Sequence, residues 1–244
     1  SPSRGLGDVY KRQLMLRYHV GTSKHWPGAT VFWQVDISGQ VRTGKVMLYN
    51  PENGRRIKEP HNYITWVHSL LKKENFNLRQ CLFGEHLLSS DQQRPVALVE
   101  SEKSALISSF YLPQYLWIAS GGKNGAFNQD AMSVLRNRRV LLFPDLGATD
   151  YWNSKMEIIR SLGIEVSLFD FMERNATKEE RDAGYDIADF LLREETKEVI
   201  FNRLITLNPA LRTLVETFDL QLVNVEKAPL SATVQHTRKG LFKR

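Results

Sequence analysis

The stretch Val96-Ala97-Leu98-Val99-Glu100-Ser101-Glu102-Lys103-Ser104-Ala105-Leu106-Ile107 decides the fold of this chain. Four apolar residues run directly into a carboxylate, and a segment compatible with a helix follows at once. A short, continuous apolar run is typical of a strand buried on both faces, as in parallel sheets. We therefore expect Glu100 at the carboxyl end of a buried strand, the edge at which open α/β sheets bind their ligands.

The same pattern returns about forty residues later. Arg139-Val140-Leu141-Leu142-Phe143-Pro144-Asp145 is a second apolar run that ends in a carboxylate. Two adjacent parallel strands of this kind place Glu100 and Asp145 at one edge of the sheet. Close carboxylates repel each other unless a cation lies between them, so this edge is a candidate site for a hard divalent metal.

Other segments indicate an α/β protein with a smaller β-rich part before the parallel sheet. Residues 29–36 and 41–49 predict two strands joined by a turn. Periodicity predicts further helices and strands, with helices at 63–73, 102–110 and 149–162 and strands at 115–119 and 164–169. Gly163 is expected to terminate the third of these helices. Residues 173–182 are polar and predict a loop or an exposed helix.

Basic residues gather on and near the predicted hairpin. Lys45, Arg55 and Arg56 occur with the aromatic residues Trp33 and Tyr49 nearby in the sequence. Cations interleaved with aromatic rings suit a surface that follows a nucleic-acid backbone and stacks on bases. An ordinary hairpin with one packed and one charged face explains the same residues.

A glycine-rich segment follows the predicted strand 115–119. It contains Gly121, Gly122 and Lys123. Glycines in such a loop let backbone N–H groups approach a phosphate, and the lysine adds a positive charge. The spacing is not that of a Walker motif, and a tight turn between strand and helix is the alternative explanation.

The blocks around Glu100 resemble the Toprim domain of bacterial-type DNA primases. The run Cys81-Leu82-Phe83-Gly84-Glu85-His86-Leu87-Leu88, a polar spacer and then residues 96–100 are similar to the approach to the Toprim glutamate, most of all in primase-like proteins of mobile elements. The resemblance covers roughly residues 17–192. It implies a largely parallel sheet flanked by helices, catalytic roles for Glu100 and Asp145, and bound Mg²⁺ or Mn²⁺.

The segment that begins at Gly184 resembles the last acidic block of primase Toprim domains. The resemblance implies that Asp186 is a third metal ligand beside Glu100 and Asp145, while Asp150 and Asp189 rank behind these three. Asp186 as the N-cap of a helix explains the same residue without a metal, and both interpretations stay open.

Three positions depart from the primase pattern. Ser101 and Ser104 stand where the pattern tends to have Gly and Asp, and Gly147 stands where it has the second Asp of Asp-x-Asp. Two of these changes remove a negative charge that a metal could use. A two-metal arrangement is harder to hold with fewer carboxylates, although Glu102 or Asp150 offers a replacement.

The domain organisation follows from these segments. We expect residues 1–13 to be a non-native leader, because they resemble translated adaptor sequence. They are therefore left out of the fold prediction. The expected order of the remaining parts is a basic β-rich subdomain at 14–92, a Toprim-like domain at 93–193, C-terminal helices at 194–225 interrupted at Asn208-Pro209, and a basic, disordered tail at 226–244.

Charge is divided unevenly within a net charge of +6. Residues 14–95 hold eleven Lys and Arg against six Asp and Glu, whereas residues 96–226 hold fourteen against twenty. A basic first part suits phosphates and an acidic second part suits metal ions, although chance asymmetry of a solvated surface is the alternative. No apolar run approaches the ~20 residues that span a bilayer, which excludes membrane-spanning classes.

Cys81 is the only cysteine, so the chain has no internal disulfide and no cysteine-based zinc site. The cytoplasm, a reducing compartment, is the expected location. The resemblance implies an upstream zinc-binding module that this fragment lacks.

Three functions are compatible with the sequence. The first is primase-like, metal-dependent nucleotidyl transfer on single-stranded DNA in mobile-element replication, with nucleotides as substrates and a replicative helicase as a partner. The second is a catalytically degenerate Toprim module that binds nucleic acid or a replication partner, for which Gly147 is the main support. The third is a metal-dependent nuclease, because synthesis and cleavage use the same acidic edge.

Overall fold

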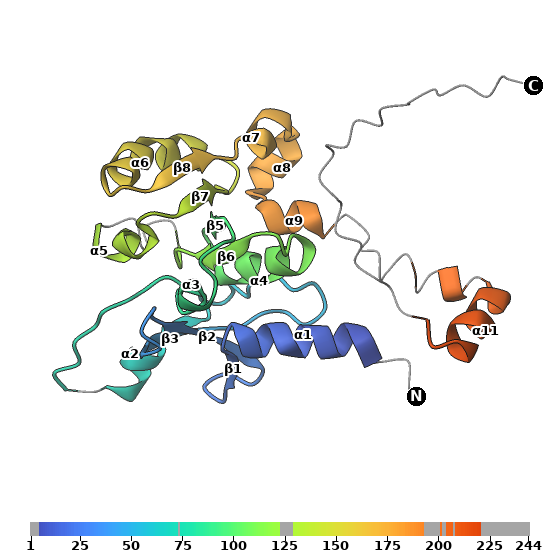
Figure 1. Cartoon of the computed structure of the whole chain (residues 1–244). Helices are drawn as coiled ribbons and strands as arrows, with labels where there is room; N and C mark the ends of the chain where they lie inside the picture. The colour runs from blue at the N-terminus through green and yellow to red at the C-terminus, as the bar shows by residue number, and fades with distance from the viewer. Residues whose placement is uncertain are drawn as a thin grey trace, which may run out of the picture. The chain divides into compact units, whose positions relative to one another are not determined.

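The computed structural model describes residues 5–72, 74–122, 129–192, 201, 204–206 and 208–220. The chain divides into two compact units, residues 1–194 and residues 195–244. The first unit contains two four-stranded sheets, one antiparallel and one parallel (Figure 1). The fold is therefore α/β with a preceding β-rich part, as the sequence predicts.

The antiparallel sheet has the strand order β1-β2-β3-β4. Its strands are β1 (Val20–Ser23), β2 (Ala29–Val35), β3 (Val41–Met47) and β4 (Ile64–Trp66), and it is accompanied by α1 (Gly5–Arg17) and α2 (Val67–Leu71). The predicted hairpin is confirmed as β2 and β3, which pair with a register shift at Gln34/Val35. Helix α1 includes residues 5–13, which the sequence analysis set aside.

The helix predicted at 63–73 is wrong over its first part. Ile64, Thr65 and Trp66 form strand β4, and the helix α2 that follows has only five residues. These β-branched and aromatic residues pair with β3, in the register Lys45↔Trp66 and Met47↔Ile64. Sheet pairing therefore overrides an apolar spacing that also fits a helix.

The parallel sheet has the strand order β6-β5-β7-β8. Its strands are β5 (Val96–Val99), β6 (Leu116–Ala119), β7 (Arg139–Leu142) and β8 (Glu165–Leu168). The helices of this part are α3 (Leu87–Ser90), α4 (Glu102–Tyr111), α5 (Gln129–Met132), α6 (Thr149–Ser161), α7 (Phe171–Asn175), α8 (Lys178–Ala183) and α9 (Ile187–Leu191), with a 3₁₀ turn at Ser133–Leu135. The strands predicted here and the helices at 102–110 and 149–162 are confirmed to within a residue or two.

Burial explains why these segments are strands. Every residue of β5 is buried, as expected for a central strand of a parallel sheet covered by helices, and every residue of the edge strand β6 is buried as well. Helix α6 buries Trp152, Met156 and Ile159, which are three or four residues apart and so share one face of the helix. Gly163 follows α6 with φ +77°, which confirms it as the terminating glycine.

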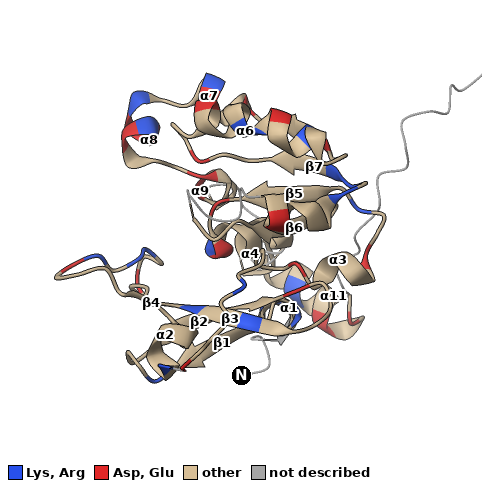
Figure 2. Ribbon diagram, turned by 90° about the vertical axis from the view of Figure 1, so that its left-hand side faces the viewer, with Lys and Arg blue, Asp and Glu red and all other residues tan. Residues whose placement is uncertain are grey.

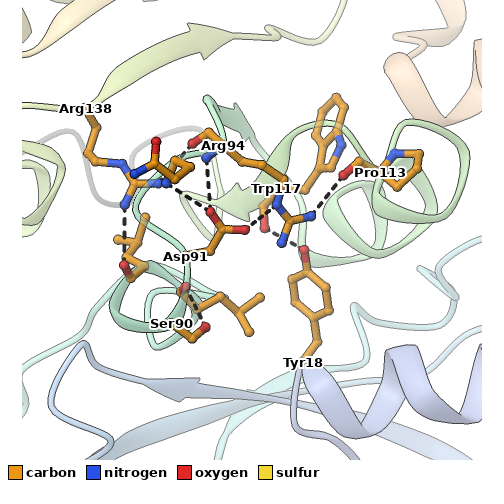
Figure 3. Close-up of polar contacts among 10 residues, drawn as sticks. Tyr18, Ser90, Asp91, Arg94, Pro113, Trp117 and Arg138 are labelled. Carbon is orange, nitrogen blue, oxygen red and sulfur yellow. Dashed lines mark hydrogen bonds and ion pairs between the residues drawn. The ribbon is translucent and has the colours of Figure 1, made fainter. Parts of the chain in front are cut away.

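Polar contacts join the segment before β5 to its surroundings (Figure 3). Arg94 contacts the Asp91 carboxylate and donates to the carbonyl of Pro113 at 2.9 Å. Arg138 donates in turn to the carbonyl of Arg94 at 3.0 Å. Tyr18 donates to the carbonyl of Trp117 at 2.8 Å, which ties the end of α1 to β6. These bonds fix the amino-terminal end of the parallel sheet, opposite the end that carries the carboxylates.

In the second unit, the described part includes α11 (Pro209–Thr217). Asn208 caps this helix by accepting from the N–H groups of Ala210 and Leu211, and Pro209 occupies its first turn. The predicted interruption at Asn208-Pro209 is confirmed. The predicted basic tail at 226–244 lies outside the described residues. Among the described helices, none combines the length and the apolar character needed to cross a membrane.

Candidate active site

The two carboxylates predicted to share one edge lie at the ends of neighbouring strands. Strand β5 pairs with β7 in parallel, with Val96 opposite Val140 and Leu98 opposite Leu142. The N–H of Phe143 continues the ladder by donating to the carbonyl of Leu98 at 2.9 Å. Glu100 follows β5 directly and Asp145 follows β7 by three residues, so the sheet brings both to its carboxyl edge.

Asp145 is the most perturbed acid in this part of the molecule. Burial, followed in order by the charges of Glu100, Asp186 and Asp189, raises its pKa to about 8. Its Oδ1 atom is buried and has no hydrogen-bond partner in the described part of the structure. A buried carboxylate oxygen without a donor, beside three other carboxylates, is an environment that a cation stabilises. We call Glu100, Asp145, Asp186 and Asp189 the acidic edge.

Asp186 joins the acidic edge from the start of α9. Its Oδ1 accepts from the N–H groups of Ala188 at 2.8 Å and Asp189 at 3.1 Å, and the Asp189 carboxylate accepts in return from the Asp186 N–H. This is a complete capping box, so the N-cap interpretation is confirmed. The other oxygen of Asp186 accepts from the hydroxyl of Ser104.

Helix α4 begins at the same edge. Ser101 is its N-cap and accepts from the N–H of Ser104 at 3.1 Å. The two serine hydroxyls lie 2.5 Å apart. Burial raises the pKa of Asp186, and the hydrogen bond from Ser104 opposes that shift. A hydroxyl therefore supports the Asp186 carboxylate at the position where the primase pattern has a further carboxylate.

A buried ion pair connects the antiparallel sheet to the start of α4. Lys45 Nζ, on β3, lies 3.1 Å from Glu102 Oε2 and donates to the carbonyl of Gly121 at 2.9 Å. The side chains of Lys45 and Glu102 are 10% and 1% exposed. The ammonium group predicted to bind phosphate is thus engaged inside the protein. Phosphate binding by Lys45 stays a prediction.

The glycine loop after β6 is fixed to the end of β5. Ser120 N donates to the carbonyl of Val99, and Gly121 N donates to the carbonyl of Glu100, both at 3.0 Å. Gly121 and Gly122 have φ of +82° and +139°, which a residue with a side chain rarely adopts. Lys123 lies outside the described residues, so the phosphate role of this loop stays a prediction.

The loop after Asp145 is held by a residue that the sequence analysis did not single out. Glu173, on α7, accepts from the N–H of Gly147 at 2.9 Å and from the hydroxyl of Thr149 at 3.2 Å, and it also contacts Arg181. The N–H of Gly147 is the main cause that lowers the pKa of Glu173. No sequence motif indicated this role for Glu173. Its partners Gly147 and Thr149 lie more than twenty positions away, and Arg181 lies on another helix.

The remaining candidates lie on the surface. Arg55 and Arg56 are exposed on the loop that joins β3 to β4, which projects from the antiparallel sheet in Figure 2. Asp150 is exposed in the first turn of α6, where a negative charge favours the helix amino terminus. No contact places Asp150 with the acidic edge among the described residues.

The acidic edge fits a metal held by few protein ligands. Over the described ranges, no group of three or more His, Cys, Asp or Glu side chains is arranged to hold a metal ion. Mg²⁺ nevertheless keeps several waters and is commonly bound through one or two carboxylates together with substrate phosphates. Glu100 and Asp145 are the two carboxylates that could hold such an ion, and the unpartnered Asp145 Oδ1 is the observation that favours a cation there.

Fold and site together define an α/β protein with carboxylates at the carboxyl edge of a parallel sheet. The family model of the domain of unknown function DUF6371 matches residues 5–146, which is more than half of the chain, and the protein belongs to this family. A comparison with curated proteins found no match.

Several solved primase structures are similar to this chain. The Aquifex aeolicus primase, with its zinc-binding and RNA polymerase domains, is 14% identical with a TM-score of 0.43, over 68% of this chain and 42% of that one. The DnaG catalytic core is 15% identical with a TM-score of 0.46, over 90% and 84%. The primase fragment of the bacteriophage T7 primase-helicase protein is 15% identical with a TM-score of 0.40, over 70% and 69%. This chain therefore spans less than half of the Aquifex primase chain.

Proposed function

We propose that this protein carries out primase-like, metal-dependent nucleotidyl transfer on single-stranded DNA, as part of the replication of a mobile element. The observation that carries the proposal is the Oδ1 atom of the half-buried Asp145, which is buried, has no hydrogen-bond partner in the described part of the structure and lies near the charges of Glu100, Asp186 and Asp189. Two acids that follow parallel strands and two at the start of α9 are brought together here, and such a group costs free energy unless it serves a cation.

The residues have distinct roles in this proposal. Glu100 and Asp145 would hold Mg²⁺ or Mn²⁺, which would supply positive charge to the phosphate oxygens of a nucleotide. Glu100, at the end of β5, also accepts or returns a proton at the attacking or leaving oxygen. Asp186 adds negative charge to the edge while it caps α9. Single-stranded DNA and nucleotides are the proposed ligands, and a replicative helicase is the proposed partner.

A calorimetric titration with Mn²⁺ tests the metal site first. Wild type is compared with Glu100→Gln and Asp145→Asn, which remove charge with little change of shape. Binding in the range of tens of micromolar is expected for wild type and is expected to disappear in both variants. A primer-synthesis assay on single-stranded DNA then tests the reaction. If wild type binds Mn²⁺ no better than the variants, the proposal of an active enzyme is wrong.

A second candidate is a module that binds nucleic acid without chemistry. The observation in its favour is that Asp186 has both carboxylate oxygens engaged within the protein, and Gly147 contributes no carboxylate. This candidate predicts binding of single-stranded DNA that is unchanged by chelation of divalent metals and unchanged in Glu100→Gln. Primer synthesis by wild type with Mn²⁺, and its loss in Glu100→Gln, would exclude it.

A further inference from the structure

Four aromatic rings form a continuous row at one end of the antiparallel sheet. The ring centroids of His25 and Trp26 are 4.5 Å apart, those of Trp26 and Tyr63 are 5.3 Å apart, and those of Tyr63 and His61 are 4.2 Å apart. His61 and Tyr63 are stacked, with an interplanar angle of 27°. We call these four residues the aromatic row. The two histidines are exposed and the two inner rings are half-buried, so the row presents ring surface to solvent.

The row is anchored by the fold rather than carried on a loose loop. The carbonyl of Trp26 accepts from Ala29 N at 2.9 Å, where β2 begins. The Trp26 ring packs against the small apolar cluster of Ala29, Val31 and Val46 on the sheet. Tyr63 precedes β4, and its carbonyl accepts from Leu48 N at 3.1 Å. Aromatic side chains held in this way lose little entropy when a flat ligand stacks on them.

Positive side chains border the row. The N–H of Tyr63 donates to the carbonyl of Ile57 at 3.4 Å, and Arg56 and Lys58 flank Ile57 in the chain. Arg55 and Lys24 are the further cations of the adjoining loops, where Glu52 and Glu59 are the acids. Among the described residues, the cations Lys24, Arg55, Arg56 and Lys58 make no ion pair, so their charges are available to a ligand.

Tyr49 connects the loop beside the row to the start of α4. It pairs with Arg56 in an antiparallel bridge within the loop that joins β3 to β4. The phenol of Tyr49 lies within range of the charges of both Arg56 and Glu102, and Glu102 is in the first turn of α4, two residues after Glu100. A ligand that passes from the aromatic row to Arg56 therefore comes close to Tyr49, on the side of the sheet where the start of α4 lies.

We propose that the aromatic row, with Lys24, Arg55, Arg56 and Lys58, binds single-stranded DNA. Bases stack on the exposed rings and phosphates follow the cations, the combination typical of surfaces that bind single strands without sequence preference. A peptide would satisfy the rings but not an excess of unpaired cations. The choice of DNA as ligand rests on the proposed function. The proposal places the bound DNA at this end of the antiparallel sheet, on residues that are remote in sequence from the acidic edge.

Fluorescence anisotropy of a labelled oligothymidine, about 15 nucleotides long to cover one binding site, tests this over a range of salt concentrations. Tyr63→Leu removes an inner ring, His61→Leu removes an exposed one, and Arg56→Gln removes a cation. We expect Tyr63→Leu to weaken binding about tenfold without changing the salt dependence, because stacking releases no counterions. Arg56→Gln is expected to lower the slope of log K against log salt by about 0.7.

Matched controls lie elsewhere on the first unit. Phe171, on α7, is 56% exposed, and Phe171→Leu removes an exposed ring away from the row. Arg160→Gln removes an exposed cation near the end of α6. Both controls are expected to bind the oligonucleotide as wild type does. His61→Leu keeps the test meaningful if Tyr63→Leu proves unfolded by circular dichroism, because the exposed His61 contributes little to the core.

The outcomes separate this proposal from the proposed function. Wild-type affinity in folded Tyr63→Leu and His61→Leu would overturn the stacking surface, as would equal affinity for a duplex, whose paired bases are not free to stack. Mn²⁺ titration of Tyr63→Leu is expected to match wild type, and Glu100→Gln is expected to keep DNA binding. If wild type does not bind Mn²⁺, the proposal of an active enzyme is refuted. The anisotropy data would still decide whether the aromatic row binds single-stranded DNA.

Discussion

The hydroxyl of Ser104, in the first turn of α4, donates a hydrogen bond to the carboxylate of Asp186, which lies 82 residues further along the chain. The bond joins the helix that follows β5 to the helix α9 that Asp186 caps. Together with the N–H groups of Ala188 and Asp189, it holds the Asp186 carboxylate in place by neutral donors within the protein. Its contribution to the acidic edge is therefore mainly its charge.

Asp186→Asn tests that division of roles. Asn caps helices as well as Asp does, so the free energy of unfolding is expected to change by less than about 0.5 kcal/mol. Loss of one negative charge is expected to weaken Mn²⁺ binding roughly fivefold, against complete loss in Asp145→Asn. Calorimetry and urea denaturation measure both quantities. Abolished Mn²⁺ binding in Asp186→Asn would instead identify this carboxylate as an essential direct ligand.

Lys45→Met is expected to destabilise the protein strongly. It leaves the buried Glu102 carboxylate without its cation, and breaking such a pair costs about 3 kcal/mol or more. The double variant Lys45→Met with Glu102→Leu is expected to regain most of that loss, because both charges are then gone. Urea denaturation measures the free energy of unfolding of wild type, Lys45→Met and the double variant. Arg174→Met, which breaks an exposed pair with Asp170, is the control and should cost under about 1 kcal/mol.

Gly147→Asp adds the carboxylate that the primase pattern places at this position. Gly147 has φ +82°, and a side chain there costs about 1 kcal/mol, although no atom lies within 4 Å of the added Cβ. We expect Mn²⁺ binding to tighten roughly fivefold through the added charge. Gly147→Ala is the control for the backbone cost and should leave Mn²⁺ affinity unchanged. Equal Mn²⁺ affinity in all three proteins would show that position 147 does not face the metal.

Glu173 gives a prediction for pH. Its pKa is lowered from 4.5 in the folded protein, chiefly by the N–H of Gly147, so the unfolded state binds a proton more readily. The stabilising contribution is therefore present above about pH 4.5 and is lost as pH falls through the lower folded pKa. Glu173→Gln is expected to lower Tm at pH 7 and to match wild type near about pH 3. Glu157→Gln, at an exposed position of α6, should match wild type throughout; a constant difference for Glu173→Gln would contradict the prediction.

Much of the parallel sheet could be predicted from sequence, because a strand buried on both faces is written as a short, continuous run of apolar residues. Val96 to Val99 and the run that begins at Arg139 each end in an acid, and the rule for parallel sheets then brings Glu100 and Asp145 to one edge. The N-cap role of Asp186 was one of two interpretations that the sequence left open, and the capping box of α9 confirms it. The strand β4 was not, because Ile64, Thr65 and Trp66 fit a helical spacing until β3 is present to pair with them.

The ion pair and tethers of the site could not be predicted, because they depend on tertiary packing. Lys45 looked like a surface cation in a basic hairpin, and only the packing of β3 against the start of α4 engages it with Glu102. Glu173 reaches the loop at Gly147 from a separate helix. The role of Lys123 stays a prediction, since it lies outside the described residues.

The order of the acids along the chain has a consequence for synthesis on the ribosome. Glu100 and Asp145 emerge first, and the capping box at Asp186 and Asp189 emerges last. A nascent chain can therefore form the β5–β7 pair while only two of the four mutually repelling charges are present. The segment that completes the cluster carries its own helix cap, so this order of synthesis allows the four charges to be brought together after the supporting strands have paired.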